Sequence, residues 1–367
     1  MKKALALIVI LAIPTVAHAR EQVNAGYLTI NSATNRAVSN SRQLRALDEQ
    51  IELLDISERR AEDTFWASQN AFTVTDIVQR EIRNMQLSAN RAFATNNARA
   101  QRETLQFVIT NHFTNILLAQ NELQIFDAEI ALLERELVIL ELMLELGMGS
   151  SFAVRQATHN LNQQNQNRAS LEIALNQTFV ELNRIMGAPL HHVYNVVFDV
   201  YYSPLNVVNI NSLISLHDRD NVNIQNARRQ VTIAREQLQT HNITSNQLNP
   251  VTGEIIPGQV TRRELEIELT QAERNVTVER ENSENRVRDI YTNIRQLELN
   301  IEGLYLQIEL LEMNLELMEE QFLAGQITRI DIDRAAANLL RLEESLRNMK
   351  ANHHILTMQL ENPHILF

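Results

Sequence analysis

The sequence predicts an all-α protein made of very long antiparallel coiled-coil hairpins in two pseudo-repeats. A long repeat, a scarcity of helix breakers and heptad-spaced apolar residues support this fold class. The segment 130–154, IALLERELVILELMLELGMGSSFAV, returns as 308–332, IELLEMNLELMEEQFLAGQITRIDI, about 178 residues later. In both copies a long apolar run meets one glycine and resumes with helical spacing, which is the pattern of a helical hairpin.

The repeat extends upstream of these two segments. Leu44 and Ile51 correspond to Ile224 and Val231 at a spacing of 180. A period of this length is too long for a short-repeat solenoid, which leaves two pseudo-equivalent halves of one fold. We therefore expect a first repeat over 20–190, a linker over 191–206 and a second repeat over 207–367.

Helix breakers mark the boundaries because the chain has only 8 glycines and 6 prolines. Neither residue occurs between Gly26 and Gly147. This predicts a helix from about Asp76 to Leu146, preceded by an interruption at 72–75, where aromatic and β-branched residues cluster. Such a helix is about 105 Å long at a rise of about 1.5 Å per residue.

Each long helix carries two apolar seams at heptad spacing. The first seam comprises Leu304, Ile308, Leu311, Leu315, Met318 and Phe322 in the second copy, and Ile130, Leu133, Leu137, Leu140 and Leu144 in the first. The second seam comprises Leu306, Leu310, Met313 and Leu317, and in the first copy Leu132, Ile139, Leu142 and Leu146. The two seams are two residues apart, about 200° around the helix, so each helix requires a neighbour on both sides. Two seams predict a wall or a closed barrel of helices.

The N-terminus has the composition of a secretory signal peptide. Lys2 and Lys3 precede an apolar stretch over 4–16, and Ala17 and Ala19 supply the small residues of a cleavage site. We expect residues 1–19 to be removed and the chain to be exported. The rest of the sequence has no apolar run of about 18 residues, so no transmembrane helix is expected.

Composition argues against several classes of function. The net charge of −12 argues against nucleic acid as a partner. The chain has no cysteine, which excludes disulfides, thiolate catalysis and cysteine metal sites. No nucleophile and base, acid pair or phosphate loop stands out, so we expect neither an enzyme nor a cofactor. The pairs His191–His192 and His353–His354 do not predict a metal site, because adjacent histidines point to different sides of a helix.

The turns and the helices that follow them carry a resemblance to a known family. The segments 144–189 and 320–362 resemble the repeated signature of the TolC family of outer-membrane efflux proteins, and 28–44 is similar to the family's opening. That signature is a glycine, Ser or Thr three residues later, an Asp-Val type pair, and then Ala and Leu at helical spacing. The matching residues are Gly147, Ser150 and Val154 in the first copy, and Gly325, Thr328, Asp331 and Ile332 in the second.

The resemblance implies a fold, an assembly and partners. Three protomers of that family each supply long helices to a periplasmic α-barrel, whose turns dock on a membrane-fusion adaptor below an inner-membrane pump. It therefore implies a homotrimer in the periplasm, outer membrane or cell envelope, working in efflux or type I-like secretion. The residues that the resemblance assigns to the docking tip are Gly147, Met148, Gly149, Ser150, Val154, Gly325, Gln326, Thr328, Asp331 and Ile332.

Acidic residues are candidates for the lumen and the gate of such a channel. Asp331 matches the family only in the second copy, where the first has Ala153, and would place charge near the closed mouth. Glutamates that recur in both copies would attract cations if they lined the lumen, and otherwise form a solvated face of a coiled coil. They are Glu134, Glu141, Glu312 and Glu319.

The sequence departs from the family in the segments expected to form membrane strands. A spanning strand needs about 9 to 11 residues of alternating character. No such pair occurs over 58–104, and 240–263 holds at most one short hairpin at Glu254–Ile256 and Gln259–Val260. We therefore expect a TolC-like α-barrel with little or no β-barrel. How such a chain is held in the envelope stays open, as does the alternative of a structural coiled-coil spacer that encloses no conduit.

Overall fold

The computed structural model describes residues 26–67, 74–197, 202–205, 209–244 and 261–362. Within these ranges the chain forms eight α-helices and two strands of three residues each. This confirms the all-α class. Among the described residues, no helix is both long enough and apolar enough to span a membrane.

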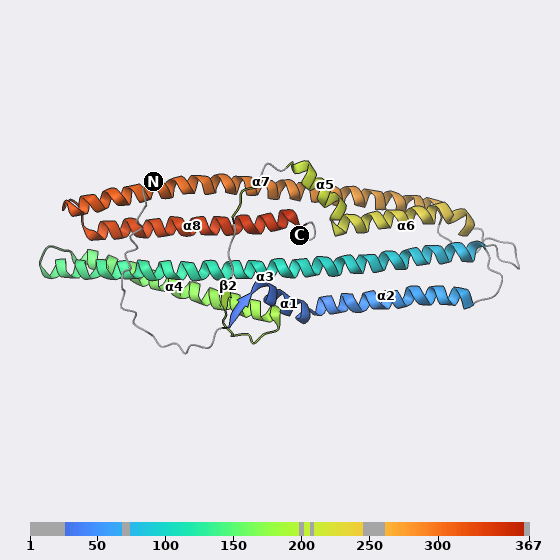
Figure 1. Cartoon of the computed structure of the whole chain (residues 1–367), viewed down its shortest axis with the longest axis horizontal. Coiled ribbons are helices and arrows are strands. Elements are labelled where there is room, and N and C mark those ends of the chain that lie inside the picture. The colour runs from blue at the N-terminus through green and yellow to red at the C-terminus, as the bar shows by residue number, and fades with distance from the viewer. Residues whose placement is uncertain (1–25, 68–73, 198–201, 206–208, 245–260, 363–367) are drawn as a thin grey trace, which may run out of the picture.

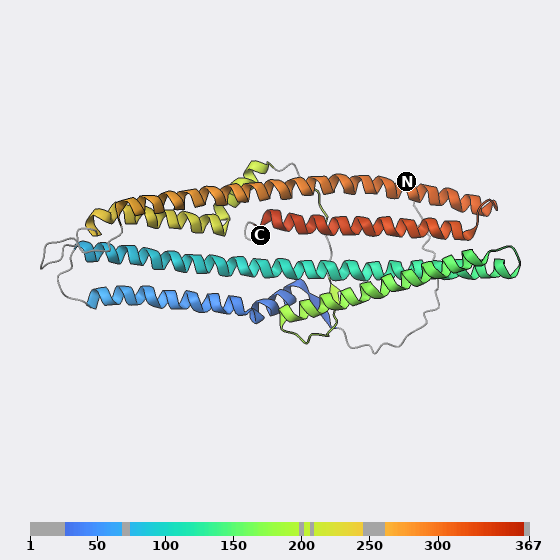
Figure 2. The same cartoon turned by 180° about the vertical axis from the view of Figure 1, so that it is seen from behind.

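The first half is built on one helix of 72 residues, α3. In both views α2 and α4 lie along α3 one after the other, so that together they accompany most of its length (Figures 1 and 2). The segment Val74–Glu145 contains no glycine or proline, which explains why α3 continues for about 108 Å. The elements of this half are β1 Tyr27–Thr29, α1 Ile30–Asn40, α2 Arg42–Ala67, α3 Val74–Glu145 and α4 Ser151–Met186.

The second half repeats this arrangement around α7, a helix of 62 residues. Helices α6 and α8 lie along α7 one after the other, as α2 and α4 lie along α3 (Figure 1). The elements are β2 Asn195–Val197, α5 Ile210–Asp220, α6 Val222–Thr244, α7 Arg262–Leu323 and α8 Arg329–Glu361. Strand β2 falls in the predicted linker and pairs in parallel with β1, with Tyr27 opposite Asn195.

Equivalent helices of the two halves start at the same distances along the chain as the repeated sequence segments. Helices α1 and α5 both have 11 residues and start 180 positions apart, and α2 and α6 start at the same spacing. Helices α4 and α8 start 178 positions apart, each after a glycine with positive φ. The structure thus repeats with the sequence, whereas the predicted bounds 20–190 and 207–367 stay a prediction.

The two halves join where α3 contacts α8 near one end and α6 near the other. In the half of the molecule with the hairpin turns, α4 contacts α3, α3 contacts α8 and α8 contacts α7, so that α4 and α7 are the first and last helices of this contact order. Near the turn α4 crosses α3 (Figures 1 and 2), and its residues line a groove together with α8. A core between α1, α3 and α4 lies near the middle of the molecule. It comprises Leu28, Ala33, Ala37, Ile109, Phe113, Ile116, Leu175, Phe179, Leu182, Met186 and Tyr194.

The C-terminal end of α4 is fastened to the junction of α1 and α2. Gly187 has φ of 67°, a left-handed conformation that glycine adopts without steric cost. The Asn40 side chain fills the space beside it, since an added Cβ at Gly187 would lie 2.5 Å from Asn40 Oδ1. The Asn40 amide donates to the carbonyl oxygens of Arg184 and Ile185 at 3.3 and 3.1 Å. It therefore adds a side-chain donor to the last carbonyl groups of α4, of which Arg184 O also accepts from the N–H of Gly187.

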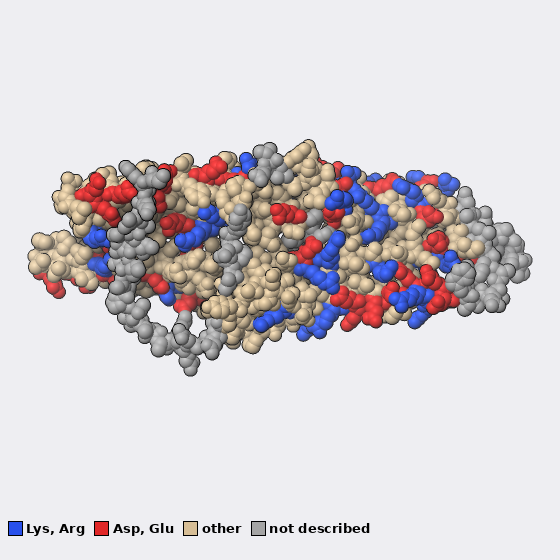
Figure 3. Space-filling model, in the orientation of Figure 1, with Lys and Arg blue, Asp and Glu red and all other residues tan. Residues whose placement is uncertain are grey.

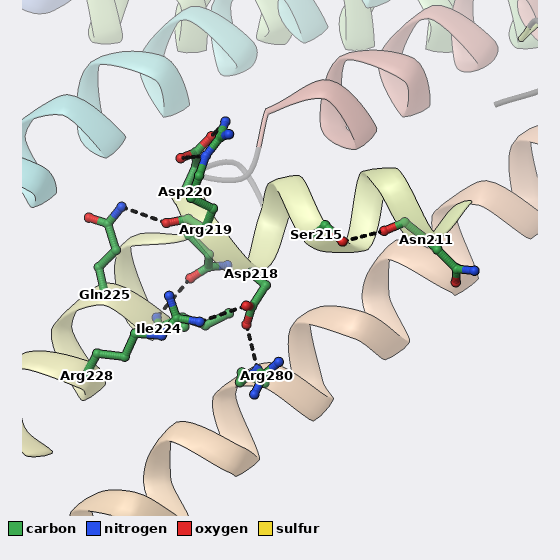
Figure 4. A network of polar contacts seen from close by, with 10 residues as sticks. Asn211, Ser215, Asp218, Arg219, Asp220, Ile224, Gln225, Arg228 and Arg280 are labelled. Atoms are coloured by element: carbon green, nitrogen blue, oxygen red, sulfur yellow. Dashed lines mark hydrogen bonds and ion pairs between the residues drawn. The ribbon is translucent and has the colours of Figure 1, made fainter. Parts of the chain in front are cut away.

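A polar network holds α5, α6 and α7 together (Figure 4). Asp218 on α5 accepts from Arg228 on α6 at 2.7 Å and forms an ion pair with Arg280 on α7 at 2.6 Å. Between α5 and α6, Asn221 Oδ1 accepts from the backbone N–H groups of Asn223 and Ile224, which is the pattern of a helix N-cap. The bend between α5 and α6 is therefore fixed by side chains on both sides.

The predicted long helix over Asp76–Leu146 is confirmed by α3. Within the segment 58–104, which predicts no strand pair, the described residues belong to α2 and α3. The predicted signal peptide over 1–19 and the short hairpin at Glu254–Ile256 and Gln259–Val260 lie outside the described residues.

His217 links the two ends of the second half. It lies on α5, is 1% exposed, and its Nε2 donates to the carbonyl oxygen of Leu360 on α8 at 2.8 Å. Burial lowers the pKa of its imidazole below the ordinary value, against smaller opposing effects of the Leu360 carbonyl and Asp220. The equivalent position of the first repeat is Ala37, which is also buried.

We predict that His217 makes the fold less stable in acid. Because the pKa is lower in the folded state, the unfolded chain takes up the proton first as the pH falls. The free energy of unfolding therefore decreases as the pH falls below about 7, through the ordinary imidazole pKa of about 6.5. His217→Ala should decrease this pH dependence, measured by urea unfolding followed by circular dichroism. His159→Ala, on the exposed face of α4, should leave it unchanged, and equal slopes for all three proteins would contradict the prediction.

Candidate functional site

The turn between α3 and α4 depends on Gly147. This residue has φ of 72°, where a side chain would be strained. Its N–H donates to Leu144 O at 3.0 Å, and the N–H of Met148 donates to Met143 O at 2.8 Å. These two bonds are those of a Schellman motif, which satisfies the last carbonyl groups of a helix.

The turn between α7 and α8 has the same geometry. Gly325 has φ of 73°, its N–H donates to Phe322 O at 2.9 Å, and Gln326 N–H donates to Gln321 O at 2.9 Å. The two turns lie at the same end of the molecule (Figure 1). The structure therefore brings both predicted tip segments together.

The two turns differ in how the next helix begins. Ser150 Oγ accepts from the N–H of Ala153 at 3.2 Å. In the second turn the Asp331 carboxylate accepts from the N–H and the hydroxyl of Thr328 at 3.0 and 2.6 Å. The hydroxyl bond and then the backbone bond lower the pKa of Asp331. Asp331, predicted as a charge at the mouth, thus also caps α8.

The remaining predicted tip residues divide into exposed and buried positions. Met148 is 68% exposed, whereas Ile332 is 4% exposed and Val154 is partly buried. Gly149 is confined, because an added Cβ would lie 2.8 Å from the backbone nitrogen of Leu144. Ile332 and Val154 therefore hold the hairpins together, and the surface of the tip is formed by the residues of the turns themselves.

Large apolar side chains surround both turns. Leu146 is 64% exposed, Phe152 74% and Leu323 84%. Figure 3 shows mainly uncharged side chains at this end of the molecule. The four glutamates proposed for a lumen are exposed on α3 and α7, and they are Glu134, Glu141, Glu312 and Glu319.

Behind the tip, α3 and α8 are joined by ion pairs that the sequence interpretation missed. Arg334 Nε lies 2.6 Å from Glu136 Oε1, and Arg135 Nη1 lies 2.9 Å from Asp333 Oδ2. Further along, Arg341 Nε pairs with Glu129. We call these contacts the α3–α8 ion pairs. The sequence carries a signal for these ion pairs, because Glu129 and Glu136 are seven residues apart and so are Arg334 and Arg341.

Glu129 is the most enclosed charge among the α3–α8 ion pairs. Glu129 is 6% exposed, and its second carboxylate oxygen accepts from the side-chain amide of Gln164 on α4. Glu129, Gln164 and Arg341 line a groove of about 450 Å³ between α4 and α8. One carboxylate therefore connects three helices.

The two histidine pairs serve the packing of other elements. His353 Nε2 lies 3.1 Å from Glu298 Oε1, and the ring of His353 contacts Tyr202 edge to face. His192 contacts Tyr194 in the same way, and its carbonyl oxygen accepts from Asn183. Among the described residues, no group of His, Asp and Glu is placed to hold a metal ion.

We predict that Arg341→Met lowers the free energy of unfolding by about 1–3 kcal/mol, because it leaves the enclosed Glu129 carboxylate with a weaker set of partners. Arg288→Met should cost less than about 1 kcal/mol, since Arg288 and Glu284 form an exposed pair on one helix. Adding Glu129→Gln to Arg341→Met should recover part of the loss. Urea unfolding measures all three, and equal costs for Arg341→Met and Arg288→Met would contradict the prediction.

Comparison with known proteins finds solved structures of similar fold but no matching family model or curated sequence. CusC, whose crystal structures concern transmembrane channel formation, superposes with a TM-score of 0.69 and 13% identity over 91% of both chains. VceC, an outer membrane protein of Vibrio cholerae, gives 0.64 and 15% over 92% of this chain and 96% of its own. CmeC, an outer membrane channel of Campylobacter jejuni, gives 0.62 and 12% over 92% and 85%. The chain therefore has the TolC-type fold of these outer-membrane channels.

Proposed function

We propose that this protein is the subunit of a TolC-like channel, an exported duct of an efflux or type I-like secretion system. Several copies would close into a ring around a solvent-filled conduit, and the two turns would dock on a membrane-fusion adaptor that connects the ring to an inner-membrane pump. The protein would work by docking and opening rather than by catalysis.

The observation that carries this proposal is an apolar seam without a cover on α7. The first seam faces α8, where Leu304 and Ile308 are 7% and 9% exposed. The second seam faces outward, with Leu306 67%, Leu310 65%, Met313 55% and Leu317 51% exposed. A heptad seam of this kind is buried by a second helix when the chain is assembled.

The order of the helices favours a ring over an open bundle. Helices α4 and α7 are the first and last helices of the contact order α4, α3, α8, α7. Copies that join through these two helices make a head-to-tail contact, which closes into a ring when the rotation between copies allows it. The resemblance of the turn segments to the TolC family implies three copies. CmeC, which has a similar fold, is an outer membrane channel, which supports a duct.

The chemistry of the tip supports docking on a protein partner. Leu146, Met148 and Leu323 are strongly exposed at one end of the molecule, next to two turns of equal geometry. Aliphatic and methionine side chains in such a patch suit a helical hairpin with an apolar seam. This chemistry supports a duct that docks on the adaptor through its tip and directs its opposite end toward the outer membrane.

We predict that the mature chain, residues 20–367, forms a hollow elongated trimer in solution. Its mass follows from light scattering and its hollow shape from small-angle X-ray scattering, both in detergent-free buffer. A monomeric rod would contradict the duct and favour the alternative, a structural coiled-coil spacer of the cell envelope. Leu310→Glu should separate the copies because it places a charge in the exposed seam, whereas Tyr27→Glu, on β1, should not.

We predict that the tip variants Gly325→Ala and Asp331→Ala weaken adaptor binding and reduce transport at least about tenfold. Gly325→Ala strains the left-handed turn, and Asp331→Ala removes the cap of α8 and its charge. Pull-down with the adaptor measures the first effect and an efflux assay the second. Glu284→Ala, on α7 away from the turns, is the matched control. If both tip variants bound and transported like the unmodified protein, the tip assignment would be wrong.

A further inference from the structure

We propose that the junction of α1 and α2 is a docking surface for an anionic polymer of the cell wall, which carries carboxylate or phosphate groups along its chain. The surface is formed by Arg36, Arg42 and Arg45, which we call the basic patch. The proposal goes beyond the duct, because it concerns how the middle of the molecule is held in the envelope and requires only one copy of the chain. It uses the predicted export, since such a polymer lies outside the inner membrane.

The charges of the basic patch are not neutralised by the chain itself. The segment 26–47 contains the three arginines and no acidic residue. All three are exposed, and none of them forms an ion pair with a described residue. The next carboxylate along the chain, Asp48, pairs with Arg102 on α3 at 3.1 Å. The patch therefore keeps its positive charge, although the whole chain has a net charge of −12.

The basic patch continues onto the end of α4. Arg45 Nη2 donates to Asn40 O at 3.2 Å, and the Asn40 side chain in turn donates to Arg184 O. The segment 182–197, which includes Arg184, also has no acidic residue. Arg184 itself pairs with Glu181 at 2.9 Å, so it adds little free charge. Figure 3 shows basic side chains gathered near the junction of α1 and α2.

The second repeat shows that a junction of this shape does not need arginines. At a spacing of 180, the equivalents of the three arginines are Leu216, Val222 and Gln225. Val222 is 6% exposed, and Gln225 accepts from a side chain of α3 at 3.0 Å, so these equivalents serve packing. The arginines near that junction are neutralised, because Asp218 pairs with both Arg228 and Arg280 (Figure 4). Unpaired positive charge is thus a property of the first repeat alone.

The position of the basic patch along the molecule favours a polymer over a lipid surface. Helix α1 packs on α3 at Ile109 and Phe113. Ile109 lies at the middle of α3, about 50 Å from either end of that helix. Interactions between exposed charges are largely screened beyond about 8 Å at physiological ionic strength. In a duct that stands between two membranes, neither lipid surface would reach the patch.

The composition of the basic patch favours a hydrophilic polyanion over a folded protein. No large apolar side chain is exposed over 30–47. Polar side chains stand between the arginines, and the exposed ones are Asn31, Asn35, Ser39 and Gln43. Protein interfaces take most of their binding energy from a few large side chains buried at the centre, which this surface lacks. Guanidinium groups instead bind carboxylates and phosphates through two parallel hydrogen bonds.

The proposed ring would repeat the basic patch three times at the same height. A polymer with regularly spaced anions can bind several patches at once, and simultaneous binding raises the overall affinity beyond that of one patch. The wall would then hold the duct at its middle and leave the two turns free to dock on the adaptor.

Co-sedimentation with purified cell-wall sacculi tests the proposal on the mature chain, residues 20–367. The protein should sediment with sacculi at low salt and stay in solution at about 1 M NaCl, where the Debye length is about 3 Å. Arg36→Gln/Arg42→Gln/Arg45→Gln should raise the dissociation constant at least about tenfold. The corresponding triple lysine variant keeps the charge and should keep most of the affinity.

A matched control removes the same charge from other places. Arg155→Gln/Arg274→Gln/Arg286→Gln changes three exposed arginines that lie apart from one another on α4 and α7, and it should bind like the unmodified protein. Circular dichroism checks that both glutamine variants are folded. Equal binding by the two glutamine variants would overturn the proposal, and so would the absence of binding to sacculi at low salt.

Further probes identify the anion. Sacculi treated with hydrofluoric acid lose their phosphate polymers. Binding that persists after this treatment assigns the carboxylates of the wall peptide, and binding that disappears assigns the phosphates. Tighter binding to phosphatidylglycerol vesicles than to either kind of sacculi would mean a lipid surface and overturn the proposal. Light scattering separates the two proposals, since a ring that ignores sacculi refutes only the patch, whereas a monomer that binds sacculi refutes only the duct.

Discussion

The packing of α8 against α3 is the contact on which the rest of the structure depends. It joins the two repeats in the half that carries the turns, and it brings an enclosed carboxylate, Glu129, between three helices. An enclosed charge is tolerated only with close and well-directed partners. Arg341 and Gln164 supply them, and this requirement fixes the position of α8 and α4 along α3. Both turns are thereby held at the same end of the molecule.

Much of this fold follows from local features of the sequence. Helix α3 extends over 72 residues because nothing between Val74 and Glu145 breaks it. The turns follow from Gly147 and Gly325, since each long helix must end in a left-handed residue to reverse its direction. The two seams follow from heptad spacing. These features are predictable because each of them depends on residues close together in the chain.

Other features depend on partners distant in sequence, and the pattern alone does not choose among them. Heptad spacing gives α3 and α7 equal second seams, yet Leu132 on α3 is 8% exposed whereas its equivalent on α7, Leu310, is 65% exposed. The parallel pairing of β1 with β2 joins segments that no local pattern connects. The charge of Asp331 predicts a place at the mouth, whereas its spacing of three residues from Thr328 is also the pattern of a helix cap.

The attachment of α4 at its far end gives the hairpin a mechanical property. Asn40 binds the carbonyl groups of Arg184 and Ile185, so α4 cannot slide along α3 without breaking these bonds. Nearer the turn, Arg168 pairs with Asp127 and Gln164 with Glu129, so α4 can rotate about this point only when these two contacts are released. Helix α4 has 36 residues, and a lever of about 54 Å turns a rotation of about 5° into a displacement of about 5 Å at Ser151. Release of these two contacts would therefore convert a small rotation near the middle of the molecule into a wide movement of the tip.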